Sequence, residues 1–162
     1  MTHLSRESLF SILSFFLLLG CLYFAYQGIL MLVFDSETPL MCVISDSMKH
    51  YDESWREVYE QRGENTLRFP FQKGFERGDL VVVKGISSPS ELKVGDVVVY
   101  RQGSKLRVHR ILAVLENGAI FITKGDANSS PDPPIPFEDV RGKVVGVIPN
   151  LGWLSLSVWR GY

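Results

Sequence analysis

Residues 77–84 spell Arg-Gly-Asp-Leu-Val-Val-Val-Lys, and residues 94–100 repeat the pattern as Val-Gly-Asp-Val-Val-Val-Tyr. In each copy Gly-Asp is typical of a turn, and the β-branched residues that follow favour a strand. Asn117-Gly118 is a strong signal for a tight turn between two further strands. The additional strands are predicted at residues 40–44, 106–115, 119–122 and 140–148. The sequence therefore predicts a mainly β domain with antiparallel strands.

Residues 9–34 form one apolar segment that contains no charged side chain. As a helix this run extends about 39 Å, which exceeds the roughly 30 Å hydrocarbon core of a bilayer. Arg6 precedes the segment, whereas Asp35 and Glu37 follow it. The positive-inside rule then predicts a cytoplasmic N-terminus, residues 1–8, and a domain, residues 35–162, on the extracytoplasmic side.

Two other interpretations of the apolar segment fit the sequence less well. A cleaved secretory signal usually has an apolar core of about 7–15 residues, and residues 9–34 are longer than that. Leu18-Leu19-Gly20-Cys21 loosely resembles a lipoprotein cleavage site, but cleavage there would leave the apolar residues 22–34 on the mature protein. A retained transmembrane anchor is the favoured prediction.

Composition excludes several classes of function. The chain has 162 residues and a net charge of -1, whereas a nucleic-acid partner usually requires a basic surface. Cys21 lies inside the apolar segment and Cys42 beyond it, so a disulfide between them is improbable. The sequence contains no C-x-x-C or H-E-x-x-H pattern, and we expect neither a metal nor another cofactor.

Two segments are harder to place. Residues 51–76 form a polar insertion, in which residues 51–61 fit a short helix with Trp55 and either Val58 or Tyr59 on one face. We expect the aromatic side chains of the insertion to pack a small satellite core, with contact to lipid or partner proteins as the alternative: Trp55, Tyr59, Phe69 and Phe71. The apolar residues 149–162 are too short to span a bilayer, and both a terminal strand and an interfacial segment stay open.

Three kinds of side chain point to nucleophilic chemistry. Ser45-Asp46-Ser47-Met48 lies about ten residues beyond the apolar segment, and His109 lies within a predicted strand. Asp126 and Asp132 follow in a loop rich in proline and serine. A serine hydroxyl becomes a good nucleophile when a neighbouring base takes its proton, and Ser, His and Asp from separate segments can supply that chemistry. We therefore predict a membrane-bound serine peptidase, although each residue alone also has an ordinary structural explanation.

Four blocks, taken in order, resemble type I signal peptidases of the archaeal and endoplasmic-reticulum kind. The blocks are Ser45-Asp46-Ser47-Met48, Arg77-Gly78-Asp79-Leu80-Val81, Arg107-Val108-His109-Arg110-Ile111, and Lys124-Gly125-Asp126-Ala127-Asn128 with Asp132. The resemblance covers most of residues 9–147. It implies a signal-peptidase-type β domain on one transmembrane helix, and an enzyme that cleaves N-terminal signal peptides from secreted and membrane preproteins after small residues.

The resemblance also implies a role for each site residue. Ser47 is expected to be the nucleophile and His109 the general base, at the place where typical bacterial members have lysine. Asp132 is expected to orient His109, and the sequence does not exclude Asp126 as that partner. The Ser45 hydroxyl is expected to help bind the oxyanion together with the backbone N–H of Ser47.

The resemblance has one departure near the nucleophile and leaves alternatives open. Relatives often have proline two residues after the methionine, where this chain has His50. The expected partners are signal-peptide-bearing preproteins and the lipid bilayer, and either the secretion translocon or other peptidase subunits. The expected location is the cell membrane, or the endoplasmic reticulum in a eukaryote. A self-cleaving repressor-type peptidase lacks the anchor, and the remaining alternative is a non-catalytic, membrane-tethered β domain that binds or scaffolds.

Overall fold

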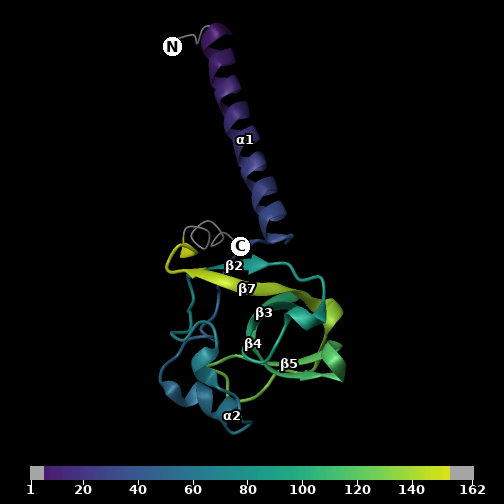
Figure 1. Cartoon of the computed structure of the whole chain (residues 1–162). Coiled ribbons are helices and arrows are strands. Elements are labelled where there is room, and N and C mark those ends of the chain that lie inside the picture. The colour runs from purple at the N-terminus through teal and green to yellow at the C-terminus, as the bar shows by residue number, and fades with distance from the viewer. Residues whose placement is uncertain (1–5, 154–162) are drawn as a thin grey trace.

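The chain consists of a long helix that stands on a β domain, in a computed structural model that describes residues 6–153 (Figure 1). The domain contains one antiparallel sheet of seven strands in the order β1-β2-β7-β3-β4-β5-β6. The strands are β1 (Leu40–Cys42), β2 (Leu80–Lys84), β3 (Val97–Gln102), β4 (Lys105–Leu115), β5 (Ile120–Lys124), β6 (Ile135–Pro136) and β7 (Val140–Ile148). The predicted fold class, a mainly antiparallel β domain behind one N-terminal helix, is confirmed.

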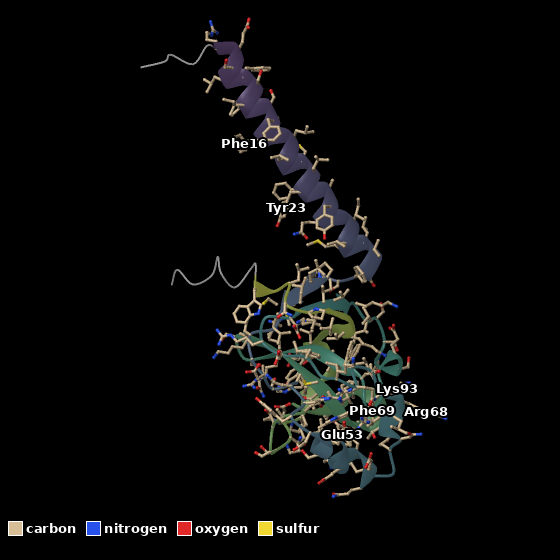
Figure 2. All side chains as sticks on the ribbon, turned by 90° about the vertical axis from the view of Figure 1, so that its left-hand side faces the viewer. Phe16, Tyr23, Glu53, Arg68, Phe69 and Lys93 are labelled. Atoms are coloured by element: carbon tan, nitrogen blue, oxygen red, sulfur yellow. The ribbon has the colours of Figure 1, made fainter. Side chains whose placement is uncertain are left out.

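Helix α1 (Arg6–Phe34) has 29 residues, and none of its side chains is buried. Its side chains project on all sides of the helix and stay exposed, as Phe16 and Tyr23 illustrate in Figure 2. An 18-residue window of the helix reaches a mean hydropathy of 2.1, and the helix is long and apolar enough to cross a membrane. A helix that is apolar all round needs an apolar environment, so α1 fits a single membrane span.

The foot of α1 is fixed to the β domain. Asp35 adopts a left-handed conformation with φ 47°, which ends the helix. The backbone N–H of Gly85, next to β2, donates to the carbonyl of Phe34 over 2.7 Å. The anchor therefore joins the β domain next to the C-terminal end of β2, rather than through a long linker.

The run of apolar residues in β3 reflects burial on both faces of the strand. All four residues from Val97 to Tyr100 are buried. Val97 and Val99 face a core cluster that includes Met48. Val98 and Tyr100 face a second cluster on the other side of the strand. A strand covered on both faces reads as a continuous apolar run rather than an alternating one.

The insertion packs against the sheet through a third cluster. Its ordered turns are η1 (Glu53–Arg56), α2 (Glu57–Glu60) and η2 (Thr66–Arg68). Trp55, Tyr59 and Phe69 are buried there against Leu112 of β4, which confirms the predicted satellite core for these three aromatic residues. Phe71 instead packs against the cluster around Met48.

Three details differ from the sequence prediction or lie outside it. The tight turn expected at Asn117-Gly118 is a 3-10 turn, η4 (Glu116–Gly118), with positive φ at all three residues. The loop after β5 contains the short strand β6, and the remaining 3-10 turns are η3 (Pro89–Glu91) and η5 (Phe137–Asp139). Residues 1–5 and 154–162 lie outside the described residues, so the two alternatives for the C-terminal segment remain as the sequence left them.

Candidate active site

Ser47 lies in a turn that follows β1 and is tied down on several sides. The carboxylate of Asp46 accepts a hydrogen bond from the backbone N–H of Arg77 over 3.0 Å. The carbonyl of Ser47 accepts one from the backbone N–H of Ala127 over 2.9 Å. The turn is therefore held against the loop before β2 and against the loop after β5.

A continuous hydrogen-bonded chain runs from Ser47 into the domain. The Ser47 Oγ lies 3.1 Å from Nε2 of His109, and Nδ1 of His109 lies 2.6 Å from Oδ2 of Asp132. His109 comes from the middle of β4 and is buried. Asp132 comes from the loop after β5, where its backbone N–H donates to the carbonyl of Thr123 over 2.8 Å. The three segments thus meet in the arrangement that a hydroxyl nucleophile requires.

The Asp132 carboxylate favours one tautomer of His109. Burial raises the pKa of Asp132, but hydrogen bonds from His109 and Thr123 outweigh burial and hold that pKa below its usual value. An ionised carboxylate accepts hydrogen bonds only, so His109 donates from Nδ1. Its Nε2 is then free to accept a proton from the Ser47 hydroxyl, which is the direction that general-base catalysis needs.

Two supporting residues were not identified from the sequence. The hydroxyl of Tyr100 lies 3.2 Å from Nδ1 of His109, and the hydroxyl of Thr123 donates to Oδ2 of Asp132 over 2.8 Å. Burial raises the pKa of Tyr100, which keeps its hydroxyl protonated. The sequence did contain one signal for Tyr100. The hairpin at residues 101–105 pairs the two strands so that Val98 lies opposite His109. Tyr100 is two residues after Val98, so its side chain lies on the same face of the sheet as His109.

Ser45 lies beside Ser47, the expected nucleophile. Its Oγ is 3.2 Å from the Oγ of Ser47, and both side chains are near the surface. The position is compatible with a second hydrogen-bond donor next to the backbone N–H of Ser47. The expected oxyanion role of Ser45 remains a prediction.

Ser47 and His109 border a groove of about 670 Å³. Its walls come from β1 and the residues after it, and from the start of β4. The apolar side chains that line it are Met41, Val43, Ile44, Met48, Phe75, Leu106 and Val108. An apolar groove with the hydroxyl and the imidazole at its margin is suited to an extended, apolar peptide segment.

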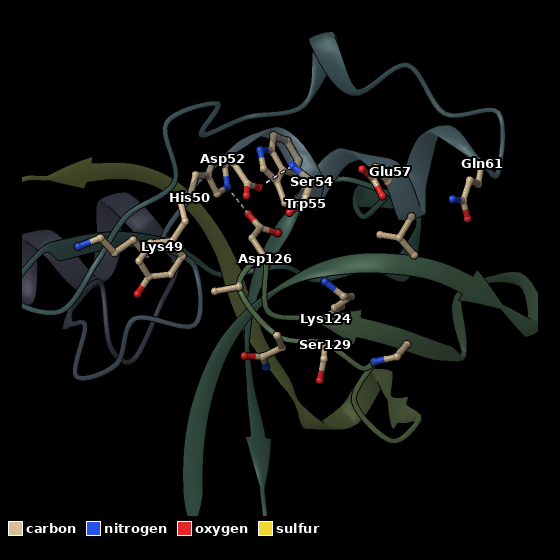
Figure 3. Close-up of a pocket in the computed structure, with 15 residues that line it drawn as sticks. Lys49, His50, Asp52, Ser54, Trp55, Glu57, Gln61, Lys124, Asp126 and Ser129 are labelled. Atoms are coloured by element: carbon tan, nitrogen blue, oxygen red, sulfur yellow. Dashed lines mark hydrogen bonds and ion pairs between the residues drawn. The ribbon is translucent and has the colours of Figure 1, made fainter.

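Asp126, the second candidate partner of His109, makes other contacts. Arg110 donates to its carboxylate from Nε over 3.0 Å and from a terminal nitrogen over 2.8 Å. Nε2 of His50 lies 2.7 Å from Oδ2 of Asp126 (Figure 3). Burial raises the pKa of Asp126, but the hydrogen bonds from His50 and Arg110 outweigh it, so the pKa lies below its usual value. Of the two aspartates that the sequence left open, Asp132 is the one within hydrogen-bonding distance of His109.

A metal centre is not formed by the described part of the chain. Within residues 6–153, no three His, Cys, Asp or Glu side chains come together in a way that could hold a metal ion. Neither Cys21 nor Cys42 is in a disulfide.

Comparison with known proteins identifies relatives over most of the chain. No family model matches the sequence. The signal peptidase complex catalytic subunit SEC11 of Sclerotinia sclerotiorum is 29% identical over 163 residues, which covers 93% of this chain and 81% of that protein. The proteins of the same name from Chaetomium globosum and Pyricularia oryzae are each 28% identical, with 94% of this chain and 82% of each protein covered. These similarities confirm the resemblance that the four sequence blocks indicated.

Proposed function

We propose that this chain, a homologue of the signal peptidase catalytic subunits, is a membrane-bound serine endopeptidase that removes N-terminal signal peptides from preproteins. The observation that carries the proposal is the chain of hydrogen bonds from Ser47 through His109 to Asp132, at the edge of an apolar groove. The names of the relatives support the same activity. A non-catalytic binding domain would not need a serine, an imidazole and a carboxylate in this order.

The reaction proceeds through an ester on Ser47. Nε2 of His109 takes the proton of the Ser47 hydroxyl as the oxygen attacks the scissile carbonyl. Asp132 stabilises the imidazolium that forms, because its carboxylate accepts from Nδ1 at 2.6 Å. The imidazolium then protonates the leaving amine, and a water activated by the same imidazole hydrolyses the ester.

The negative charge that develops on the substrate carbonyl needs donors aimed at it. We assign this role to the backbone N–H of Ser47 and the hydroxyl of Ser45, which lies 3.2 Å from the Ser47 oxygen. One such donor typically lowers the barrier by about 2.7–4 kcal/mol. Ser45 therefore affects turnover more than binding.

The groove determines which peptides are cleaved. A preprotein segment that extends along the groove lies beside β1 and the start of β4, where it can bind as an added strand. Small side chains at the first and third positions before the scissile bond match the small-x-small form of signal-peptide cleavage sites. Most of the side chains that line the groove are apolar, and Lys105 and Arg107 are the charged side chains among them.

The membrane supplies the common surface for enzyme and substrate. In this proposal α1 crosses the bilayer with residues 1–8 in the cytoplasm, and the β domain lies on the extracytoplasmic side. The relatives are named as subunits of a signal peptidase complex, and we extend an association with other membrane-bound subunits to this chain. The secretion translocon remains an alternative partner.

The decisive experiment compares serine variants of the purified full chain in a preprotein cleavage assay. Ser47→Ala should abolish turnover, because it removes the nucleophile. Ser45→Ala should lower kcat by about 10²–10³-fold with little change in KM, because a lost oxyanion donor acts in the transition state. Ser104→Ala, in the exposed β3–β4 hairpin, is the matched control and should cleave normally.

A covalent probe separates the peptidase from the non-catalytic alternative. An acylating or phosphonylating serine reagent should label the wild-type chain at Ser47 and leave Ser47→Ala unlabelled. Normal cleavage by Ser47→Ala would refute the assignment of the nucleophile. An unlabelled, inactive wild-type chain would favour the binding domain.

A further inference from the structure

A buried charged cluster lies behind the catalytic turn, and the reaction above does not use it. His50 and Asp126 meet at 2.7 Å (Figure 3), and Arg110 contacts the same carboxylate. The side chains of Asp126 and Arg110 are fully buried, and that of His50 is 8% exposed. Trp55 covers the cluster, with its ring stacked on His50 at 4.4 Å between centroids and with the Arg110 guanidinium 4.7 Å from its ring.

The partners of His50 fix its protonation state. Nδ1 of the ring lies 3.1 Å from the backbone carbonyl of Gln72, and Nε2 lies 2.7 Å from the Asp126 carboxylate. A carbonyl oxygen only accepts hydrogen bonds, and so does an ionised carboxylate. Arg110 donates to both oxygens of Asp126, which keeps the carboxylate ionised. Both ring nitrogens of His50 must therefore donate, and a ring that donates twice is the imidazolium cation.

The cluster is connected to the nucleophile by the backbone. Asp126 is followed by Ala127, whose N–H donates to the carbonyl of Ser47 over 2.9 Å. His50 follows Ser47 by three residues, and the intervening Lys49 pairs with Gly74 in an isolated bridge. The turn of Ser47 and the loop after β5 are therefore joined by two contacts, the backbone bond from Ala127 to Ser47 and the side-chain contact of His50 with Asp126.

We propose that His50 is a positioning residue whose imidazolium form clamps Asp126 and thereby holds Ser47 at its distance from His109. The inference rests on the proposed function for its kinetic consequence, but the protonated state of His50 does not depend on it. Loss of the proton would leave one ring nitrogen with its lone pair facing an acceptor, and one of the two hydrogen bonds would be lost. A Ser47 oxygen displaced by up to about 1 Å from its position beside His109 reacts more slowly. The groove that binds the peptide is unchanged.

Some of the groups around His50 favour its imidazolium form, and others oppose it. The Asp126 carboxylate from the loop after β5 favours the imidazolium, and so does the stacked face of Trp55. Arg110 of β4 and Lys124 at the end of β5 oppose it as like charges. Burial lowers the pKa of Lys124, which weakens that opposition. The remaining ionisable residues that line the same cavity as His50 are Lys49, Tyr51, Asp52 and Glu57.

The first test observes the ring of His50 directly, in the full chain labelled with ¹⁵N-histidine in detergent micelles. At neutral pH both ring nitrogens of His50 should carry a bonded proton, whereas those of His109 should not both do so. The three histidines of the chain are assigned by comparison with His50→Gln and with a His3 variant. The experiment works equally on Ser47→Ala, so it does not require an active enzyme.

The second test measures kinetics against pH. In His50→Gln the donors belong to a single amide nitrogen, which cannot reach the Gln72 carbonyl and the Asp126 carboxylate at the same time. We expect kcat to fall about 10–100-fold with KM changed less than about twofold. In the wild type, kcat should fall at low pH, because catalysis needs a neutral base, and at high pH, because the clamp needs two ring donors. His50→Gln should keep the acid limb and lose the alkaline one.

Lys49→Gln is the matched control. Lys49 is the neighbouring cation on the same turn and pairs with Glu76 at the surface. It should leave kcat and the alkaline limb as in the wild type, because it has no contact with Asp126. Thermal unfolding of each variant shows whether the fold is kept.

The outcomes separate the clamp from the peptidase itself. A singly protonated His50 ring at neutral pH would overturn the proposal, and so would a folded His50→Gln protein with wild-type kcat and pH profile. If His50→Gln does not fold, the ring measurement on the wild type still decides the protonation state. A doubly protonated His50 in a chain that neither cleaves preprotein nor reacts with a serine probe would refute the proposed function and leave the clamp standing.

Discussion

His109 and Arg110 are adjacent in the sequence and serve two different aspartates. Successive side chains of a strand point to opposite faces, so β4 directs His109 towards Ser47 and Arg110 towards the satellite core around Trp55. The loop after β5 supplies a carboxylate to each, Asp132 on one side and Asp126 on the other. At the scale of the residue, the two carboxylates therefore have separable effects.

Asp132→Asn should impair catalysis without unfolding the domain. The amide keeps the shape of the carboxylate but carries no charge to stabilise the His109 imidazolium, and it permits the wrong tautomer. We expect kcat to fall by about 10²–10⁴-fold. Preprotein cleavage gives kcat, and circular dichroism with thermal unfolding verifies the fold. A kcat within twofold of the wild type would remove Asp132 from the proposed mechanism.

Asp126→Ala should lower the stability of the fold, in addition to releasing the clamp on His50. It leaves the fully buried guanidinium of Arg110 without its carboxylate, and such a loss typically lowers the free energy of unfolding by about 3–5 kcal/mol. The matched control is Asp139→Ala, because Asp139 and Arg141 form a partly exposed pair at 4.0 Å; such pairs contribute about 0–1 kcal/mol. Denaturant unfolding compares the two variants, and equal losses would contradict the buried-pair argument.

The residues of the site could be predicted from the sequence motifs and the family resemblance, but the sequence left the choice between the two aspartates open. Ser47, His109 and two aspartates followed from motifs, because acyl transfer needs those groups. Asp126 and Asp132 lie in one loop, and the backbone bond from Asp132 to Thr123 that sets their directions is a property of the folded loop. The contact of His50 with Asp126 joins residues 76 positions apart, and no local pattern reports it.

At the scale of the element, strands were easier to predict than their neighbours in the sheet. Residues 80–84 and 140–148 were predicted as strands with the bounds observed for β2 and β7. That β7 lies between β2 and β3 was not predicted, because a strand buried on one or both faces fits several sheet orders. Local sequence patterns predict where strands form, whereas long-range packing determines their order in the sheet.

The junction between α1 and β2 yields a prediction at this scale. A Cβ added to Gly85 would lie 1.6 Å from the carbonyl oxygen of Asp35, so Gly85→Ala must push the foot of the helix away from the sheet. We expect a loss of about 1–3 kcal/mol in the free energy of unfolding, as for other overpacked sites. Gly28→Ala is the control within α1, since a Cβ there meets nothing within 4 Å. Equal unfolding curves for the two variants would show that the junction is not tight.

At the scale of the whole molecule, the groove and the anchor act together. The foot of α1 is bonded to Gly85 and leads within six residues to β1, whose Met41 and Cys42 border the groove. The proposed active site is therefore held close to the bilayer surface, where the cleavage region of a membrane-inserted preprotein would emerge. Confinement to one surface raises the effective concentration of enzyme and substrate for one another.

Removal of residues 1–34 tests this coupling. The shortened chain should lose roughly 10²-fold or more in kcat/KM on a preprotein inserted in vesicles, since the two partners then meet from solution. Its kcat/KM on a short soluble peptide with the same cleavage site should change little, because Ser47, His109 and Asp132 all belong to the β domain. A version in which residues 9–34 are replaced by an unrelated apolar helix of equal length is the matched control, and it should recover the preprotein rate. Equal losses of kcat/KM on both substrates would mean that α1 supports the fold of the site. If the replacement helix restores neither rate, α1 itself makes specific contacts that the reaction needs.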